Sequence, residues 1–200
     1  MKDLYNTIQS TSAGLYKEKG SKFIALAYPM SSEEAIKAEL AGLKKEYYDA
    51  RHHCFAWRLG AELTQYRVSD DGEPSGCAGK PILGQIKSRG LTDILVVVIR
   101  YFGGSLLGVG GLIRAYRSAS ADALDQAQII ELKVKGYFKL EFGYPQLNRV
   151  MKVIKDFKLE FVNQQFDLEC SLTLIIWKRI EEQVIGKLSL IEGCQHTRVA

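Results

Sequence analysis

The sequence has few cysteines, and none of them has the spacing that makes cysteine a metal ligand. Cys54, Cys77, Cys170 and Cys194 form no C-x-x-C pair, and the three histidines do not complete a zinc motif. Isolated reduced thiols are therefore expected rather than a disulfide framework, as is usual in a cytoplasmic protein. These residues predict neither a metal nor a cofactor.

Long apolar segments are also missing. The longest apolar run covers residues 94–99, whereas a helix that crosses a bilayer needs about 20 residues. The opening segment MKDLYNTIQSTSAG lacks the apolar core of a secretory signal. We expect no membrane contact, and we expect a cytoplasmic location.

Two nucleotide-binding motifs are approached but not completed. The segment GEPSGCAGKP has Pro81 where a phosphate loop needs a serine or threonine for magnesium. Gly108, Gly110 and Gly111 lack the G-x-G-x-x-G spacing, and no acidic residue ends a second strand about 20 residues later. The spacing of a calcium-binding loop is also absent. The sequence therefore argues against an NTPase, a Rossmann site and an EF-hand.

The composition is that of an ordinary folded protein. The 200 residues are 46% hydrophobic and 25% charged, with 27 basic and 23 acidic side chains. This length allows one large domain or two small ones, with enough apolar surface to fold without disulfide bonds or structural metal ions. The net charge of +4 permits contact with nucleic acid without requiring it.

Hydrophobic periodicity predicts an α/β first part. A helix is expected to begin at Ser31 or Ser32, which can cap it, and a short helix is expected to end at Gly90. The run TDILVVVIRYF is typical of a strand that is buried on both faces. In order, the expected elements are a strand at 22–28, a helix from 33, a strand at 54–59, a helix at 82–89, a strand at 92–102 and a helix at 112–127.

The second part is predicted to follow the order β-α-β-β-α-β, which is that of a ferredoxin-like unit. Alternating runs predict strands at 131–143, 159–167, 168–177 and 194–200, and amphipathic segments predict helices at 144–158 and 178–193. We therefore predict an α+β protein with two domains, at 1–130 and 131–200.

An acidic loop, RVSDDGEPSGCAGKPILG, occupies residues 67–84. Asp70, Asp71 and Glu73 flank Gly72, and two interpretations remain open. The carboxylates either form turns and cap a helix, or hold a divalent cation with hard oxygen ligands. Cys77 also has two interpretations. It is either a small buried side chain or a nucleophile that is activated at the start of a helix.

Residues just before the expected helix of this loop offer a further possibility. Backbone N–H groups near Ser75 and Gly76, together with Lys80, have the chemistry to hold an anion.

A glycine turn, GGSLLGVGG, follows the buried strand and leads into a helix. Arginine next to aromatic side chains is used to bind phosphates and stack bases, and it is also common in protein-binding hot spots. The alternative is simple packing of Phe102 beside surface arginines. The candidate binding residues here are Arg100, Tyr101, Phe102, Gly103, Gly104, Gly108, Gly110, Gly111 and Arg114.

The segments RHHCFAWRLG, SDDGEPSGCAGKPIL and VVVIRYFGGSLLGVGGLIRAY together resemble the YigZ/IMPACT family, over residues 19 to about 124. The resemblance implies a first domain like domain 2 of ribosomal protein S5. It also implies a ferredoxin-like second domain, similar to a late domain of elongation factor G. Eukaryotic members of the family restrain an amino-acid-starvation kinase pathway that controls translation initiation.

Three functions are compatible with these features. The first is a non-catalytic protein linked to translation, which contacts RNA, the ribosome or a translation factor through a cleft formed jointly by the acidic loop and the glycine turn. The second is a metal-dependent hydrolase of a phosphate or acyl substrate that uses Asp70, Asp71 and Glu73, with Lys80 or Arg114 stabilising charge. The third is a protein–protein adaptor.

Overall fold

The computed structural model describes residues 3–199, which form two compact units, one ending at Leu132 and the other beginning at Lys133. The predicted mixture of helices and sheets is confirmed. In chain order, the elements are β1 (Leu4–Ile8), β2 (Ser12–Glu18), β3 (Ser21–Pro29), α1 (Glu33–Glu46), β4 (His52–Leu59), β5 (Gln65–Ser69), α2 (Gly79–Ser88), β6 (Ile94–Tyr101), α3 (Gly108–Asp125), β7 (Ile129–Lys133), β8 (Lys135–Gly143), α4 (Leu147–Asp156), β9 (Glu160–Phe166), β10 (Glu169–Trp177), α5 (Glu181–Ser189) and β11 (Cys194–Arg198), with short 3-10 turns before α4 and α5.

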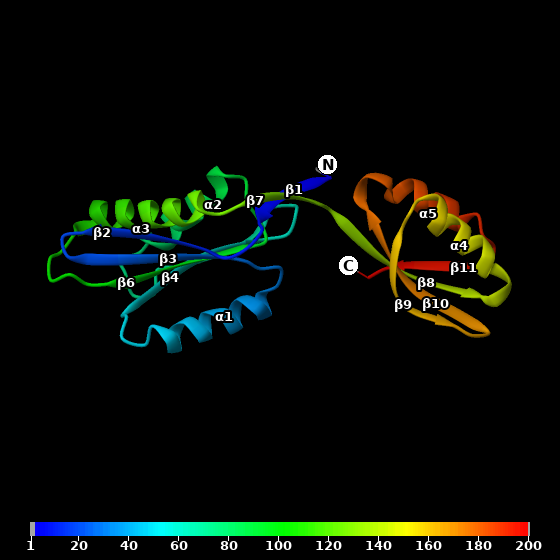
Figure 1. The fold of residues 1–200 in the computed structure, drawn as a ribbon, viewed down its shortest axis with the longest axis horizontal. Coiled ribbons are helices and arrows are strands. Elements are labelled where there is room, and N and C mark those ends of the chain that lie inside the picture. The colour runs from blue at the N-terminus through cyan, green and yellow to red at the C-terminus, as the bar shows by residue number, and fades with distance from the viewer. Residues whose placement is uncertain (1–2, 200) are drawn as a thin grey trace. The chain divides into compact units, whose positions relative to one another are not determined.

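The N-terminal unit is a three-layer arrangement around a five-stranded sheet. The strand order is β2-β3-β6-β4-β5, and every neighbouring pair is antiparallel. Helix α1 covers one face, and α2 and α3 cover the other (Figure 1). Strand β6 lies in the middle and its residues 94–100 are all buried, which confirms the strand predicted to be covered on both faces.

Local sequence signals account for the helix boundaries. Ser32 is the N-cap of α1, and its Oγ accepts a hydrogen bond from the backbone N–H of Ala35. Helix α3 begins at Gly108, four residues before the predicted start, so the end of the glycine turn is its first turn. Glycines are poor helix formers, but burial of Leu112, Ala115 and Tyr116 stabilises this helix through packing.

The strand predicted at 131–143 is two strands. Strand β7 pairs with β1 in a separate two-stranded sheet, whereas β8 belongs to the sheet of the C-terminal unit. Alternation continues through both segments, so periodicity alone did not reveal the break at Val134. Strands β1, β2 and β5 were not predicted either.

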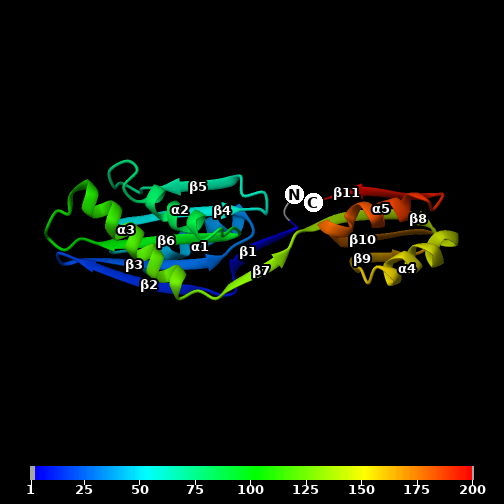
Figure 2. The ribbon, with the colours of Figure 1, turned by 90° about the horizontal axis from the view of Figure 1, so that it is seen from above.

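The C-terminal unit has the predicted element order β-α-β-β-α-β. Its sheet has the antiparallel order β11-β8-β10-β9, with β11 and β9 at the edges (Figure 2). Helices α4 and α5 pack on one face, where Val150, Ile154, Val184 and Leu188 meet the inward side chains of β8 and β10. Among residues 3–199, no helix is both long and apolar enough to cross a bilayer.

Candidate binding site

The acidic loop lies between β5 and α2, and its first acid caps the helix. The Asp70 carboxylate accepts hydrogen bonds from the backbone N–H groups of Gly76 (2.8 Å), Ala78 (3.0 Å) and Gly79 (2.8 Å). Burial opposes the charge of this carboxylate, but the three donors and nearby Lys80 outweigh burial and lower its pKa. The N–H groups offered by the sequence to an anionic ligand therefore donate to Asp70.

Glu73 joins the same loop to the core of the unit. Its Oε1 accepts hydrogen bonds from Arg100 Nη1 on β6, at 2.5 Å, and from the Tyr116 hydroxyl on α3, at 2.8 Å. The Glu73 and Arg100 side chains are only 3% and 7% exposed. Burial also raises the pKa of the Tyr116 hydroxyl, and raises the pKa of the adjoining Cys54 thiol to about 12. Arg100 is thus a core residue and is not available to a ligand, which corrects its assignment to the cleft surface.

Asp71 holds the start of β4. Its Oδ2 accepts a hydrogen bond from the backbone N–H of His53 (2.7 Å), and its backbone oxygen lies 2.9 Å from Nδ1 of His52. Lys44 on α1 approaches the other carboxylate oxygen, at 3.5 Å. The three acids of the loop therefore have three separate sets of partners.

This separation means that the three carboxylates do not converge on one point. A divalent cation needs several oxygen ligands that converge on one point, and within residues 3–199 no three His, Cys, Asp or Glu side chains are placed to do so. Cys77 is buried in the core of the unit, where burial, followed by Asp70 and Glu73, raises the pKa of its thiol. A raised pKa disfavours the thiolate that a nucleophile needs.

The glycine turn is held against the β2–β3 hairpin at its first glycine. A Cβ on Gly103 would lie 1.9 Å from the carbonyl carbon of Gly20, and the Gly103 N–H donates to Ser21 Oγ. Gly104 and Gly108 have positive φ angles of 86° and 69°, which glycine adopts without steric cost. Gly103 is thus required by packing, and the next two by backbone conformation.

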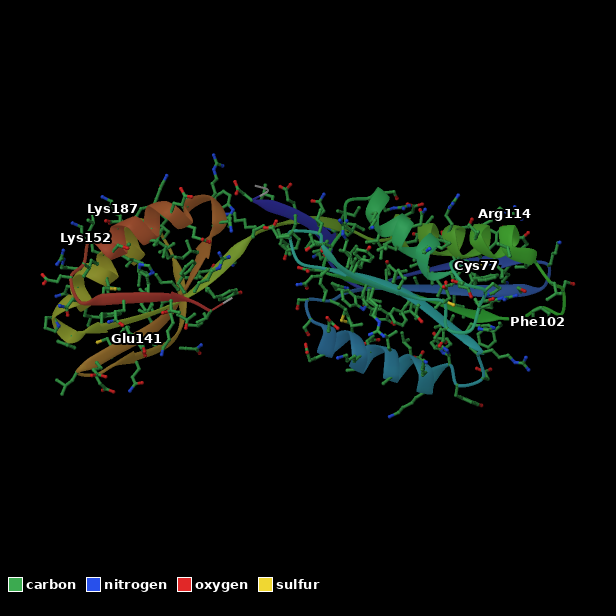
Figure 3. The ribbon with its side chains drawn as sticks, turned by 180° about the vertical axis from the view of Figure 1, so that it is seen from behind. Cys77, Phe102, Arg114, Glu141, Lys152 and Lys187 are labelled. Atoms are coloured by element: carbon green, nitrogen blue, oxygen red, sulfur yellow. The ribbon has the colours of Figure 1, made fainter. Side chains whose placement is uncertain are left out.

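Three apolar side chains are exposed in this turn or directly before it. Phe102, Leu106 and Val109 are 51%, 86% and 58% exposed, and Figure 3 shows Phe102 on the same unit as Arg114 and Cys77. Tyr101 does not belong to this exposed group. It packs on the α1 side of the sheet and donates its hydroxyl proton to Asp49. Strand alternation thus separates Tyr101 from Arg100 and Glu73.

A cleft lies between α2 and α3, with a volume of about 500 Å³. We call it the α2–α3 cleft. Lys80 and Arg117 are its two cations, both exposed, and neither has a hydrogen bond or ion pair within residues 3–199. The other lining residues are Gly76, Pro81, Gly84 and Gln85. Of the predicted site residues, Gly76 and Lys80 line this cleft.

Arg117 is the cation of the cleft that the predicted set did not contain, although it contained Arg114. Arg114 is exposed and forms a surface ion pair with Glu18 of β2, at 3.1 Å. Residues 114 and 117 are one helical turn apart, so a modest rotation turns Arg117 toward α2. The position of Arg117 in α3, directly after buried Tyr116, was the signal that could have identified Arg117 as a cleft residue.

Known proteins resemble this chain in sequence and in fold. Residues 19–124 match the family model of the Impact N-terminal domain. An IMPACT family member of Haemophilus influenzae is 37% identical over 89% of this chain and 88% of its own length. IMPACT family member YigZ of Escherichia coli is 38% identical over 74% of each chain. A crystal structure of a hypothetical protein, 30% identical, covers 100% of this chain and 99% of its own, with a TM-score of 0.78.

Proposed function

The chain belongs to the IMPACT family, and on that premise we propose that it is a non-catalytic protein that regulates translation by contacting RNA, the ribosome or a translation-associated protein. The contact surface in this proposal is the α2–α3 cleft with the adjoining glycine turn. We also assign the N-terminal unit to the class of domain 2 of ribosomal protein S5, and the C-terminal unit to the ferredoxin-like class.

One observation carries the proposal. The acids of the loop are engaged by backbone N–H groups, His53, Lys44, Arg100 and Tyr116. Lys80 and Arg117 form no hydrogen bond or ion pair with the described residues 3–199, although Lys80 lies near enough to Asp70 to lower the pKa of that carboxyl. The cleft therefore presents two exposed cations. Two exposed cations in one cleft match the chemistry of a phosphate-bearing partner.

The test is binding of the purified chain to bacterial ribosomes and to a fluorescein-labelled oligouridine at increasing salt. Each cation that neutralises a phosphate adds about 0.7–0.9 to the slope of log affinity against log salt. Lys80→Gln with Arg117→Gln should weaken binding and flatten this slope by between one and two units. The control is Lys37→Gln with Lys45→Gln, which removes the same charge from the exposed side of α1.

The proposal fails if wild-type protein binds neither probe at low salt. It also fails if the α1 control loses as much affinity as the cleft variant, because the cleft would then have no special role.

The exposed apolar side chains favour a protein–protein adaptor as the second candidate. Phe102, Leu106 and Val109 lie within eight residues and are each more than half exposed, and exposed apolar groups of this kind mark interaction sites. An adaptor predicts that a ribosome-associated protein remains bound after nuclease treatment, and that Leu106→Ser releases it. Loss of the complex on nuclease treatment would exclude this candidate.

A further inference from the structure

Among the described residues of the C-terminal unit, no helix covers the second face of its sheet. Helices α4 and α5 pack on the face formed by Phe138, Leu140, Leu172 and Leu174. The residues that alternate with these point to the other face, and the side chains contributed by β8 are exposed. We call this surface the open face, and its central strands are β8 and β10.

Strand register divides the open face into two ends. Lys135 pairs with Trp177, and Tyr137 pairs with Ile175, so aromatic and apolar side chains gather at one end. Toward the other end, Glu141 pairs with both Ser171 and Gln195, and Ser171 pairs with Gln165. That end has the hydroxyl and amide groups.

Cations surround the aromatic end. Lys133 Nζ lies 4.5 Å from the centre of the Trp177 ring, and the Arg179 guanidinium lies 5.5 Å from it. A hollow of about 260 Å³ beside Trp177 and Ile175 is also lined by Lys158. Because both cations lie over the Trp177 ring, they offer phosphate contacts there, while Tyr137, 37% exposed on the neighbouring strand, offers a ring on which a base can stack.

Two acids, Glu160 near the aromatic end and Glu141 at the polar end, are held in weak surface pairs. Glu160 accepts a hydrogen bond from Lys135 at 3.2 Å, and the two side chains are 71% and 43% exposed. Glu141 accepts one from Lys139 at 2.6 Å, and both are about half exposed. Exposed ion pairs contribute little to stability, so a phosphate can replace either carboxylate.

The polar end has a second hollow, of about 600 Å³. It is lined by Lys139, Glu141, Gln165, Ser171 and Gln195, among others. Side-chain amides and hydroxyls both donate and accept hydrogen bonds, as the edges of unpaired bases and the ribose 2′-hydroxyl require.

The charge of the unit points to the same kind of partner. From Lys133 onward the sequence has eleven lysines and arginines against eight acidic residues, whereas the preceding part has sixteen against fifteen. Most of the net charge of +4 therefore belongs to the smaller unit. A basic surface with aromatic side chains on the central strands of an antiparallel sheet is suited to single-stranded RNA.

We propose that the open face of the β8–β10 sheet binds a short segment of single-stranded RNA. Tyr137 stacks on a base, Lys133, Lys135 and Arg179 around Trp177 contact phosphates, and the polar end contacts base edges and the 2′-hydroxyl. The proposal rests on the proposed function only for the choice of RNA over DNA. It needs no RNA contact in the α2–α3 cleft.

The test uses the full chain and a fluorescein-labelled oligouridine, with affinity measured by anisotropy at about 50 mM and about 200 mM salt. Tyr137→Ala should weaken binding about tenfold, and Tyr137→Phe should restore it, because the ring is retained. Lys133→Gln should weaken binding severalfold and reduce the loss of affinity caused by salt. The DNA oligomer of the same sequence should bind more weakly than the RNA.

Matched controls lie on the helix side of the same unit. Lys152→Gln and Lys187→Gln remove the same charge from α4 and α5, which Figure 3 shows with Glu141 of the strands labelled for comparison. Neither change should alter RNA affinity more than twofold. Circular dichroism should show that all variants remain folded, since Tyr137 is 37% exposed.

A second measurement reports directly on binding at the open face. In a Trp57→Phe background, Trp177 is the chain's remaining tryptophan, and its fluorescence should be quenched when the unlabelled oligouridine binds.

Four outcomes overturn the proposal. They are equal loss in the helix-side controls, unchanged Trp177 fluorescence at saturating RNA, equal affinity for the DNA oligomer, and loss of RNA binding only in the Lys80 and Arg117 variants. The last would place the RNA in the α2–α3 cleft and leave the open face to a protein. If the cleft variants bind RNA normally while Tyr137→Ala does not, the proposed role of the cleft fails and the open face stands.

Discussion

The two units differ in how many faces of their sheets are covered by helices. The five-stranded sheet is covered on both faces, so the N-terminal unit is left with the gap between two helices and with loop tips as places for a partner. The C-terminal sheet is covered on one face, and the other face is free to form a broad surface. The position of the helices therefore decides what kind of site each unit can have.

One ion pair of the N-terminal unit contrasts with the surface pairs of the C-terminal sheet. In the N-terminal unit an ion pair lies inside the fold, where Glu73 and Arg100 are almost fully buried. In the C-terminal unit the pairs Lys135–Glu160 and Lys139–Glu141 lie on the surface. A buried pair fixes a structure, because losing one partner leaves an unsolvated charge, whereas a surface pair exchanges with solvent or a ligand at small cost.

The largest expected effect tests this contrast between the pairs. Glu73→Ala should lower the free energy of unfolding of the N-terminal unit by about 3–5 kcal/mol, because Arg100 stays buried without a counter-ion. Glu141→Ala should change the C-terminal unit by less than about 1 kcal/mol. Urea titrations followed by fluorescence separate the units, because each contains one tryptophan, Trp57 or Trp177.

Single-tryptophan backgrounds, Trp177→Phe for the first titration and Trp57→Phe for the second, provide the readouts. Similar losses from the two substitutions would contradict the contrast between a buried and a surface pair.

Glycine substitutions give an effect of intermediate size, with opposite signs. Gly103→Ala places a methyl group 1.9 Å from the Gly20 carbonyl carbon, and should destabilise the N-terminal unit by about 1–3 kcal/mol. Gly110→Ala in α3 and Gly186→Ala in α5 meet no atom within 4 Å, and each should stabilise its own unit by about 0.5–1 kcal/mol. Thermal unfolding measured by circular dichroism shows the direction of each change. Destabilisation by Gly186→Ala, or stabilisation by Gly103→Ala, would show that backbone contacts are not what distinguishes these positions.

Part of each sheet could be predicted from the sequence. The unbroken run of β6 predicted burial on both faces, and the alternating runs of β8 and β10 predicted strands. The cap of α1 at Ser32 followed from residue type and position alone. These features depend on neighbours in the sequence, which is why periodicity and capping chemistry were sufficient.

The partners of the three acids in the acidic loop could not be predicted in the same way. Asp70, Asp71 and Glu73 look like one cluster in the sequence, but the fold sends them to different partners. The partner of Glu73 on β6 is 27 residues away, and the His53 contact of Asp71 spans 18 residues. Such pairs are created by strand order and helix placement, which no local pattern specifies.

The smallest expected effect concerns pH and is confined to the N-terminal unit. Because its folded-state pKa is lowered from the ordinary value of 3.8, the Asp70 carboxylate stabilises the fold above that value and loses this contribution as pH falls through the folded-state pKa. Asp70→Asn should thus cost about 1–2 kcal/mol at pH 6, as for loss of a helix cap. The difference from wild type should shrink steadily below about pH 4.

The C-terminal unit is the internal control for this experiment. Helices α4 and α5 have no side-chain cap, so Asp70→Asn should leave the Trp177 transition unchanged at every pH. Urea titrations at pH 6, 5, 4 and 3, followed separately through Trp57 and Trp177, measure both units. A wild-type to Asp70→Asn difference that stays constant down to pH 3 would show that the charge of Asp70 is not what stabilises the start of α2. The effect would then come from the shape of the side chain, which asparagine retains in part.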